Sequence, residues 1–215
     1  MPHRSWTGRA APRRGSRAAN HDRRTHEGQT MTGARWPARP GAPALVLASA
    51  SRTRAAMLRN AGLAFETVPA AIDEAAVKQR LRGDGASAER VAGTLAEMKA
   101  ERVAGTIAAE RPDALVLGAD QVLDLDGALL DKPADRAAAA AHLQRLSGKR
   151  HRLVSAAALL RGGQRIWNCT DSASLVVRPL SARFIAAYLD AAGADALVSV
   201  GAYRLEGLGA PLFAA

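Results

Sequence analysis

The chain has 215 residues, 48% of them hydrophobic and only 4% aromatic, so Ala, Val and Leu must fill most of the core of one domain. No apolar run approaches the roughly 18 residues that a membrane-spanning helix needs, which excludes a membrane partner. A single cysteine, Cys169, excludes an internal disulfide framework and a cysteine-based zinc site. These features predict a soluble cytoplasmic protein.

The formal net charge of +10 is concentrated near the N-terminus. Residues 1–42 hold nine Arg and no Lys against two acidic residues, whereas the rest of the chain carries 21 basic and 18 acidic side chains. A segment so rich in Arg, Gly, Pro, Ser and Thr buries too little surface to offset its ordering entropy. We therefore predict a disordered basic extension over 1–42 and one ordered domain over 43–215, which disfavours nucleic-acid binding.

Other interpretations of the extension stay open. It is Arg-rich and poor in acidic residues, as a nucleic-acid-binding arm or a transit peptide would be. Met31 also offers an internal start close to the first strand, so the extension could reflect the choice of start site. An inert tail or a start-site artefact is favoured, and a secretory signal is not supported because no apolar core segment is present.

Hydrophobic periodicity predicts alternating strands and helices in the first half of the ordered part. The expected elements are a strand at 44–47, a helix over 51–61, a strand at 65–68, a helix over about 87–110 and a strand at 114–117. Asp126-Gly127 between two apolar runs then indicates a β-hairpin.

The second half places two strands next to each other in the sequence. The expected elements are a helix over 136–146, strands at 151–160 and 166–177, a helix over 181–189 and a closing segment at 198–202. Alternating elements followed by neighbouring strands predict an α/β fold with a mixed sheet.

The segment Ser49-Ala50-Ser51-Arg52-Thr53-Arg54 connects a buried strand to a helix and is the first candidate for phosphate binding. A helix start offers free N–H groups and a positive dipole end, and guanidinium groups match phosphate oxygens. On this segment alone, a Ser N-cap followed by surface arginines is the favoured interpretation. The segment contains no glycine and is therefore not a Walker loop.

Asp120 follows a buried strand, at the end where open α/β sheets bind their ligands. A carboxylate at this position could bind a metal ion or act as a general base toward water, although a turn-capping Asp explains it equally well. Lys99 and Lys132 are candidates to neutralise phosphate, and Asp73-Glu74 is a candidate site for Mg²⁺ or Mn²⁺. Each is more often a solvated charge when taken alone, but together they suit a polyphosphate with a divalent cation.

Several segments, in this order along the chain, are similar to motifs of the Maf family of nucleoside triphosphate pyrophosphatases. They are Ser49 to Arg54, Asp73-Glu74, Leu95 to Ala100, Gly118-Ala119-Asp120, Asp131-Lys132-Pro133, Leu146-Ser147-Gly148 with His151, and Gly201-Ala202-Tyr203 before Glu206-Gly207-Leu208-Gly209. The resemblance covers about 44 to 213. The family's first motif is Ser-x-Ser-Pro-Arg-Arg, from which Arg52 and Thr53 depart.

The resemblance implies a two-lobed α/β domain, with a mixed, twisted sheet flanked by helices, that hydrolyses a nucleoside triphosphate to a monophosphate and pyrophosphate. It implies Asp120 and Lys99 as catalytic residues, a divalent cation at Asp73 and Glu74, and a homodimer. The implied substrate-binding residues are Ser49, Ser51, Thr53, Arg54, Gln121, Lys132 and Glu206.

Two alternatives to a working enzyme stay open: a catalytically impaired regulatory relative, and a basic-tailed nucleic-acid-binding protein. The latter lacks the aromatic residues expected of a single-strand platform. Family members continue past Leu212-Phe213, whereas this sequence ends at Ala215. We therefore expect a truncated C-terminus and a less stable domain.

Three positions bear on the choice of nucleotide. The family's subgroup acting on dTTP and UTP has Arg, Thr and Gln where the subgroup acting on 7-methyl-GTP has Trp, Gln and Glu. This chain has Thr53, Gln121 and Glu206 there, so two of the three resemble the second subgroup. A carboxylate only accepts hydrogen bonds, which suits a guanine edge, so we expect a modified or ordinary purine triphosphate to be preferred over dTTP.

Overall fold

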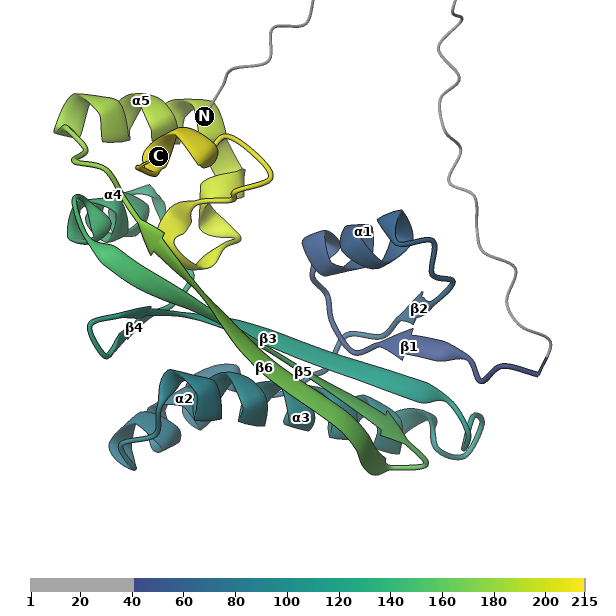
Figure 1. The fold of residues 1–215 in the computed structure, drawn as a ribbon. Coiled ribbons are helices and arrows are strands. Elements are labelled where there is room, and N and C mark those ends of the chain that lie inside the picture. The colour runs from purple at the N-terminus through teal and green to yellow at the C-terminus, as the bar shows by residue number, and fades with distance from the viewer. Residues whose placement is uncertain (1–40, 215) are drawn as a thin grey trace, which may run out of the picture. The chain divides into compact units, whose positions relative to one another are not determined.

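A computed structural model of the chain describes residues 41–214, so the predictions for the basic extension lie almost wholly outside the described residues. Residues 41–214 form one mixed sheet of six strands, with the order β2-β1-β3-β5-β6 and with β4 paired to β3 (Figure 1). The strands are β1 (Leu45–Leu47), β2 (Glu66–Thr67), β3 (Leu115–Leu125), β4 (Ala128–Leu130), β5 (Arg150–Arg161) and β6 (Gln164–Val176).

The sheet combines a parallel part with an antiparallel part. Strand β1 pairs in parallel with β2 and β3, whereas β3, β5 and β6 pair antiparallel in long ladders. The turn between β3 and β4 has positive φ angles at Asp126 (53°) and Gly127 (83°), as a tight two-residue hairpin requires. The predicted α/β class, the mixed sheet and this hairpin are confirmed.

Each α-helix begins after a Ser or Asp whose side chain accepts a backbone N–H of the first turn. The helices are α1 (Arg52–Asn60), α2 (Glu74–Gly83), α3 (Ala88–Ile107), α4 (Arg136–Leu146) and α5 (Ala182–Ala192). The sequence pattern predicts no helix between 68 and 87 and leaves Asp73-Glu74 in a loop, which is wrong, because Asp73 is the N-cap of α2 and Glu74 is its first residue. No helix within residues 41–214 combines the length and apolarity needed to cross a bilayer.

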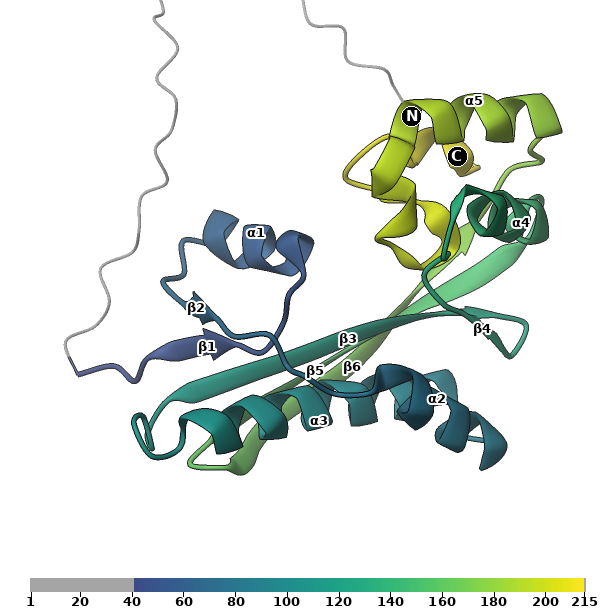
Figure 2. The same ribbon diagram turned by 180° about the vertical axis from the view of Figure 1, so that it is seen from behind.

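Helix α3 packs unusually close to β3, along one face of the sheet (Figure 2). Its buried stripe includes the fully buried small residues Ala92, Ala96 and Ala100. On the strand side stands Gly118, where a Cβ atom would overlap the backbone carbonyl of Ala96 and lie 2.8 Å from the amide of Ala100. The missing side chain at Gly118 therefore sets the distance between α3 and β3.

The C-terminal part of the chain covers the far end of β3. Helices α4 and α5 share a core cluster with Leu123, Tyr188 and Tyr203 and with three short 3₁₀ turns. These turns are η1 (Gly193–Leu197), η2 (Val200–Ala202) and η3 (Ala210–Leu212). In both ribbon views α1 and the α4–α5 group lie on the same side of the long strands and apart from each other, as the two-lobed arrangement predicts.

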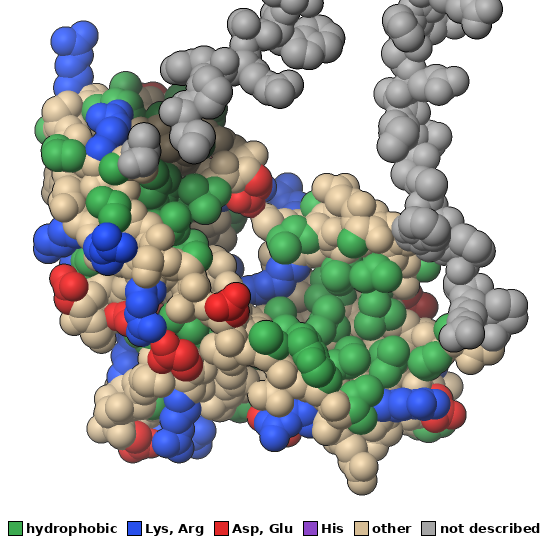
Figure 3. Space-filling model, viewed as in Figure 1, with side chains coloured by type: hydrophobic (Ala, Val, Ile, Leu, Met, Phe, Trp, Pro, Cys, Tyr) green, Lys and Arg blue, Asp and Glu red, His purple; other side chains and the backbone are tan. Residues whose placement is uncertain are grey.

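Part of the sheet face turned away from α3 carries no helix. Leu117, Leu159 and Trp167 are register partners on adjacent strands and thus share this face, and Trp167 is 50% exposed. Figure 3 shows hydrophobic side chains gathered over this part of the sheet.

Candidate active site

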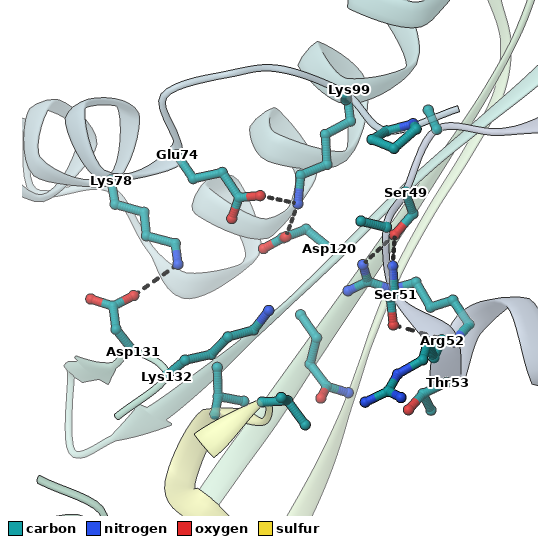
Figure 4. Close-up of a pocket in the computed structure, with 18 of the residues that line it drawn as sticks. Ser49, Ser51, Arg52, Thr53, Glu74, Lys78, Lys99, Asp120, Asp131 and Lys132 are labelled. Carbon is teal, nitrogen blue, oxygen red and sulfur yellow. Dashed lines mark hydrogen bonds and ion pairs between the residues drawn. The ribbon is translucent and has the colours of Figure 1, made fainter. Parts of the chain in front are cut away.

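A cavity of about 680 Å³ lies between α1 and the C-terminal turns, over the middle of β3. Its walls come from the β1–α1 connection, α2, α3, β3, the segment after β4 and the chain from Val198 to Arg204. A volume of this size accommodates a nucleotide-sized ligand. Figure 4 shows serine side chains of the β1–α1 connection and charged side chains of α1, α2, α3, β3 and the segment after β4 around it.

The centre of the cavity is a buried ion-pair group. Alternation along β3 puts Asp120 on the same face as Gly118, and Lys99 lies one turn beyond Ala96 on α3. The Lys99 Nζ atom is 2.6 Å from Asp120 Oδ1 and 2.8 Å from Glu74 Oε1. Lys99 and Asp120 are each only 6% exposed, so the close packing at Gly118 brings two predicted catalytic residues into direct contact.

Glu74 completes this group from the first turn of α2. Burial raises the pKa of its carboxyl, but the hydrogen bond from Lys99 and the charges of Lys99, Lys78 and Lys132 outweigh burial and hold the pKa below its ordinary value. Glu74 is therefore ionised at neutral pH. The Lys99 ammonium thus pairs with two carboxylates, Glu74 and Asp120, that are far apart in the sequence.

Asp120 has one oxygen free for a ligand. Its Oδ2 atom is buried and accepts no hydrogen bond from residues 41–214. A buried carboxylate oxygen without a partner is uncommon and needs an explanation. A proton from a bound water or a cation would satisfy this atom.

The predicted phosphate segment forms a second wall. Ser49 is 7% exposed, and its Oγ atom accepts from the Ser51 amide (3.1 Å) and from Arg54 Nη1 (3.3 Å). Ser51 caps α1 by accepting from the Arg54 amide at 3.3 Å. Both serines therefore orient Arg54 at the positive end of α1, and all three residues line the cavity.

Opposite this wall, α2 and the segment after β4 meet around Asp131. Asp131 accepts from Lys78 Nζ at 2.8 Å and from Arg82 Nη2 at 3.1 Å. Burial raises the pKa of Asp131, but Lys78 and Arg82 together hold it below its ordinary value. Lys132, the next residue, extends into the cavity (Figure 4).

The lining is cationic in balance. Seven Arg or Lys residues face three carboxylates, Glu74, Asp120 and Asp131. The seven are Arg52, Arg54, Lys78, Lys99, Lys132, Arg82 and Arg204. An excess of four positive charges in a concave site favours a polyanionic ligand.

Sequence reasoning missed Lys78, Arg82 and Arg204. The signal for the first two was their spacing of four residues, which puts both on one face of a helix that was not predicted. We find no comparable sequence signal for Arg204.

The three residues expected to bear on nucleotide choice are placed differently. Thr53 and Gln121 line the cavity, and Gln121 Nε2 donates to Ser155 Oγ at 2.9 Å. Glu206 lies outside the lining and accepts from Arg204 Nε at 3.1 Å. Burial raises the pKa of Glu206, but its backbone amide, Arg204 and the Thr53 hydroxyl hold it below the ordinary value. Glu206 is therefore an anion beside Thr53 and Arg204, which themselves line the cavity.

Asp73 is not brought into the cavity lining. Its Oδ1 atom accepts from the Ala76 amide at 3.0 Å as the cap of α2, while the next residue, Glu74, points inward. Within residues 41–214 no group of three or more Asp, Glu, His or Cys side chains forms a cluster that could hold a metal ion. A metal-binding role for Asp73 stays a prediction.

Comparison with known proteins agrees with this geometry. The family model described as Maf-like protein matches residues 44–215. A nucleoside triphosphate pyrophosphatase of Paramagnetospirillum magneticum (strain AMB-1) is 50% identical over 168 residues, which are 78% of this chain and 84% of the relative. A 7-methyl-GTP pyrophosphatase of Rhizobium meliloti (strain 1021) is 50% identical over 171 residues, 80% of this chain and 84% of the relative. The chain belongs to the Maf family.

Proposed function

We propose that this protein hydrolyses a nucleoside triphosphate to a nucleoside monophosphate and pyrophosphate. The observation that carries the proposal is the free, buried Oδ2 atom of Asp120, fixed by Lys99 in a cavity whose lining is mainly cationic. The names of the relatives, nucleoside triphosphate pyrophosphatase and 7-methyl-GTP pyrophosphatase, support the same reaction class.

The triphosphate would bind to the cationic walls. Arg54 and Lys132 pair with phosphate oxygens, and the hydroxyls of Ser49 and Ser51 help to fix them. The Oδ2 atom of Asp120 accepts a proton as water attacks the α-phosphorus. The new bond joins the water oxygen to that phosphorus, the bond to the bridging oxygen breaks, and pyrophosphate leaves. Positioning and fixed charges supply most of the acceleration in such chemistry.

A divalent cation, Mg²⁺ or Mn²⁺, fits the residues present. Asp120 has an unpartnered oxygen, Glu74 is ionised beside it, and the donor set is hard oxygen. Two carboxylates are few for a protein-only site, so substrate phosphates would complete the coordination, as Mg²⁺ sites often require. When bound, such a cation neutralises charge on the phosphates.

The nucleobase would be recognised near Gln121 and Glu206. We propose a preference for a purine triphosphate, modified or ordinary, over dTTP, because Gln121 lines the cavity and Glu206 is an anion at its edge. The name of the Rhizobium meliloti relative supports a guanine-type base.

We also propose that the protein forms a homodimer. The helix-free sheet face at Leu117, Leu159 and Trp167 is an apolar surface that a second copy would cover. Light scattering on the purified protein tests this, and a monomer at tens of micromolar contradicts it.

The function is tested by measuring pyrophosphate release from a panel of 7-methyl-GTP, GTP, ATP, dTTP and UTP. We expect pyrophosphate and nucleoside monophosphate in equal amounts, loss of turnover in excess chelator, and recovery on adding Mg²⁺ or Mn²⁺. Release of orthophosphate, or no turnover of any nucleotide with metal present, contradicts the proposal. Full turnover in excess chelator contradicts the requirement for a cation but leaves the proposed reaction standing.

A further inference from the structure

One stretch of the cavity wall has a backbone conformation that its own residues do not favour. Gly201 and Ala202 have φ angles of 76° and 63°, and Ala202 is one of two non-glycine residues with positive φ within 41–214. Val200 and Arg204, on either side of this turn, both line the cavity. A left-handed alanine persists only where its surroundings over-determine it. The segment Val200–Arg204 must therefore be held by contacts from elsewhere.

Two buried side chains, His151 and Tyr203, and the partly buried Phe213 hold it. His151 Nε2 and the Tyr203 hydroxyl are 2.6 Å apart, and the two side chains are 2% and 4% exposed. The two rings meet edge to face at 5.7 Å, and Phe213 packs on Tyr203 at 4.9 Å. His151 lies at the start of β5, in register with Leu175 of β6, so the anchor is part of the sheet.

A second hydroxyl fixes the turn from α5. Tyr188 donates to the Ala202 carbonyl at 3.1 Å. At Gly201 a Cβ atom would lie 2.5 Å from Leu123 Cδ1, so the turn also presses directly against β3. Sheet and helix thus contact three successive residues of the segment.

The charge states of the pair and the groups left unpaired together indicate the direction of its hydrogen bond. Burial raises the pKa of Tyr203 and lowers that of His151, so a protonated phenol meets a neutral imidazole. If Nε2 donated, both the Tyr203 O–H and His151 Nδ1 would be left without a partner within 41–214, so Tyr203 donates and His151 Nε2 accepts. The Nδ1 atom then carries the proton, although it is buried and has no partner within 41–214. An unpaired buried donor of this kind is a cost that the Tyr203 hydrogen bond offsets.

We propose that His151 and Tyr203 are positioning residues, whose hydrogen bond fixes the Val200–Arg204 segment as one wall of the nucleotide cavity. The expected effect on substrate binding rests on the proposed function, whereas the role of the pair in fixing the segment does not. Neither side chain lines the cavity, so both act through Val200 and Arg204. The sheet that carries Asp120 thereby also fixes the position of the Val200–Arg204 wall.

Tyr203→Phe in the full chain tests this, because it keeps the ring and removes only the hydroxyl. Hydrogen exchange should accelerate by roughly tenfold at the amides of 199–204 and stay unchanged in β3 and α3, since a local opening exposes only that segment. For the most active nucleotide of the panel, KM should rise between about twofold and tenfold, the equivalent of one lost hydrogen bond, while kcat changes less than about twofold.

Ile107→Val is the matched control. It removes one buried methyl group far along α3, which lowers stability by a comparable amount without touching the turn. It should change neither KM nor exchange at 199–204. Unchanged exchange at 199–204 in Tyr203→Phe overturns the proposal, as does a fall in kcat with KM unaltered. If the wild type turns over no nucleotide, the proposed function fails, and the exchange measurement alone decides the positioning role.

Discussion

The cavity has two kinds of wall, and they differ in how they are held. The inner wall is Lys99 on α3 and Asp120 on β3, each 6% exposed and carried by regular secondary structure. The outer edge is Arg204, which lines the cavity, and its ion-pair partner Glu206 lies beside it in an irregular segment with a side chain that is 49% exposed. The groups that we propose for bond cleavage thus stand on regular secondary structure, and the group that we propose for base selection stands on an irregular segment.

The ion pair on the inner wall, Lys99–Asp120, and the ion pair at the outer edge, Arg204–Glu206, also differ in their contribution to stability. A buried pair such as Lys99–Asp120 is strongly destabilising when one partner is removed, because the other is left as an unpaired buried charge. An exposed pair such as Arg204–Glu206 contributes about 1 kcal/mol or less. Changes on the inner wall should therefore cost far more, in turnover and in stability, than changes on the outer edge.

The largest effect is expected for Asp120→Asn. The amide keeps the shape and removes the proton acceptor, so kcat should fall by about 100-fold or more while the fold persists. Lys99 keeps Glu74 as a partner, which limits the loss of stability. Pyrophosphate release and thermal unfolding measure the two quantities. Asp113→Asn, a change at an exposed carboxylate far from the cavity, is the control. Near-normal turnover of Asp120→Asn contradicts the assignment of the base.

Gly118→Ala should be the next most damaging change. The added methyl group overlaps the Ala96 carbonyl, so α3 must move away from β3 and take Lys99 with it. We expect a loss of about 1–3 kcal/mol in unfolding free energy, together with lower turnover. Gly105→Ala, on α3 itself, is the matched control, because nothing lies within 4 Å of its added Cβ, and it should stabilise slightly. Equal melting temperatures for the two variants contradict the role of Gly118.

The inner wall was also the part that the sequence predicts best. Lys99 lies four residues after Leu95 and four before Val103, so helical periodicity alone puts it on the buried stripe of α3. The apolar run at 114–117 marks the start of β3, but Asp120 lies in the middle of that strand and not after its end as predicted, because the strand continues to Leu125. Ser51 gives a standard N-cap signal for α1. Local patterns of this kind depend on neighbours in the chain, which a single sequence displays.

What the sequence did not reveal depends on contacts distant in the chain. Helix α2 was missed because Leu81 is its one buried residue, so it has no apolar stripe long enough to be recognised. The left-handed Ala202 has no local signal either, since alanine disfavours that conformation and contacts from distant residues such as His151 and Tyr188 hold the segment. The position of Glu206 outside the cavity lining likewise depends on the fold of the C-terminal turns.

A smaller effect is expected at the outer edge. Glu206→Gln replaces a group that only accepts hydrogen bonds with one that also donates, so the ratio of kcat/KM for GTP over dTTP should fall. Since Glu206 is half exposed and outside the lining, we expect a change of only about twofold to fivefold. Side-by-side kcat/KM values for GTP, 7-methyl-GTP, dTTP and UTP measure it. Glu110→Gln, at an exposed site, is the control. A clear lead for dTTP or UTP in the wild type contradicts the purine preference itself.

The smallest effect is expected in the pH dependence of stability, and it arises at His151, which lies outside the cavity lining. Burial lowers the pKa of His151 from 6.5, so between that value and the folded-state pKa the unfolded chain binds a proton that the native state does not. Stability should therefore be constant above about pH 6.5 and fall as the pH is lowered below it. The lowered carboxyl pKa values of Glu74 and Asp131 act only below their ordinary values of 4.5 and 3.8, outside this window.

His151→Gln should flatten this decline, measured as the difference in melting temperature between roughly pH 7.5 and pH 5.5. It lowers stability at both pH values because the Tyr203 hydrogen bond is altered, but the difference between them should shrink. His142 is a matched control, since burial followed by the charge of Arg145 also lowers its pKa, so His142→Gln should remove a separate share of the same decline. Across this pH range, a tenfold difference in proton affinity between the folded and unfolded chain corresponds to about 1.4 kcal/mol, which sets the scale of both shares. An unchanged pH dependence in His151→Gln means that the imidazole is not kept neutral by burial, and with it the assigned direction of the Tyr203 hydrogen bond is wrong.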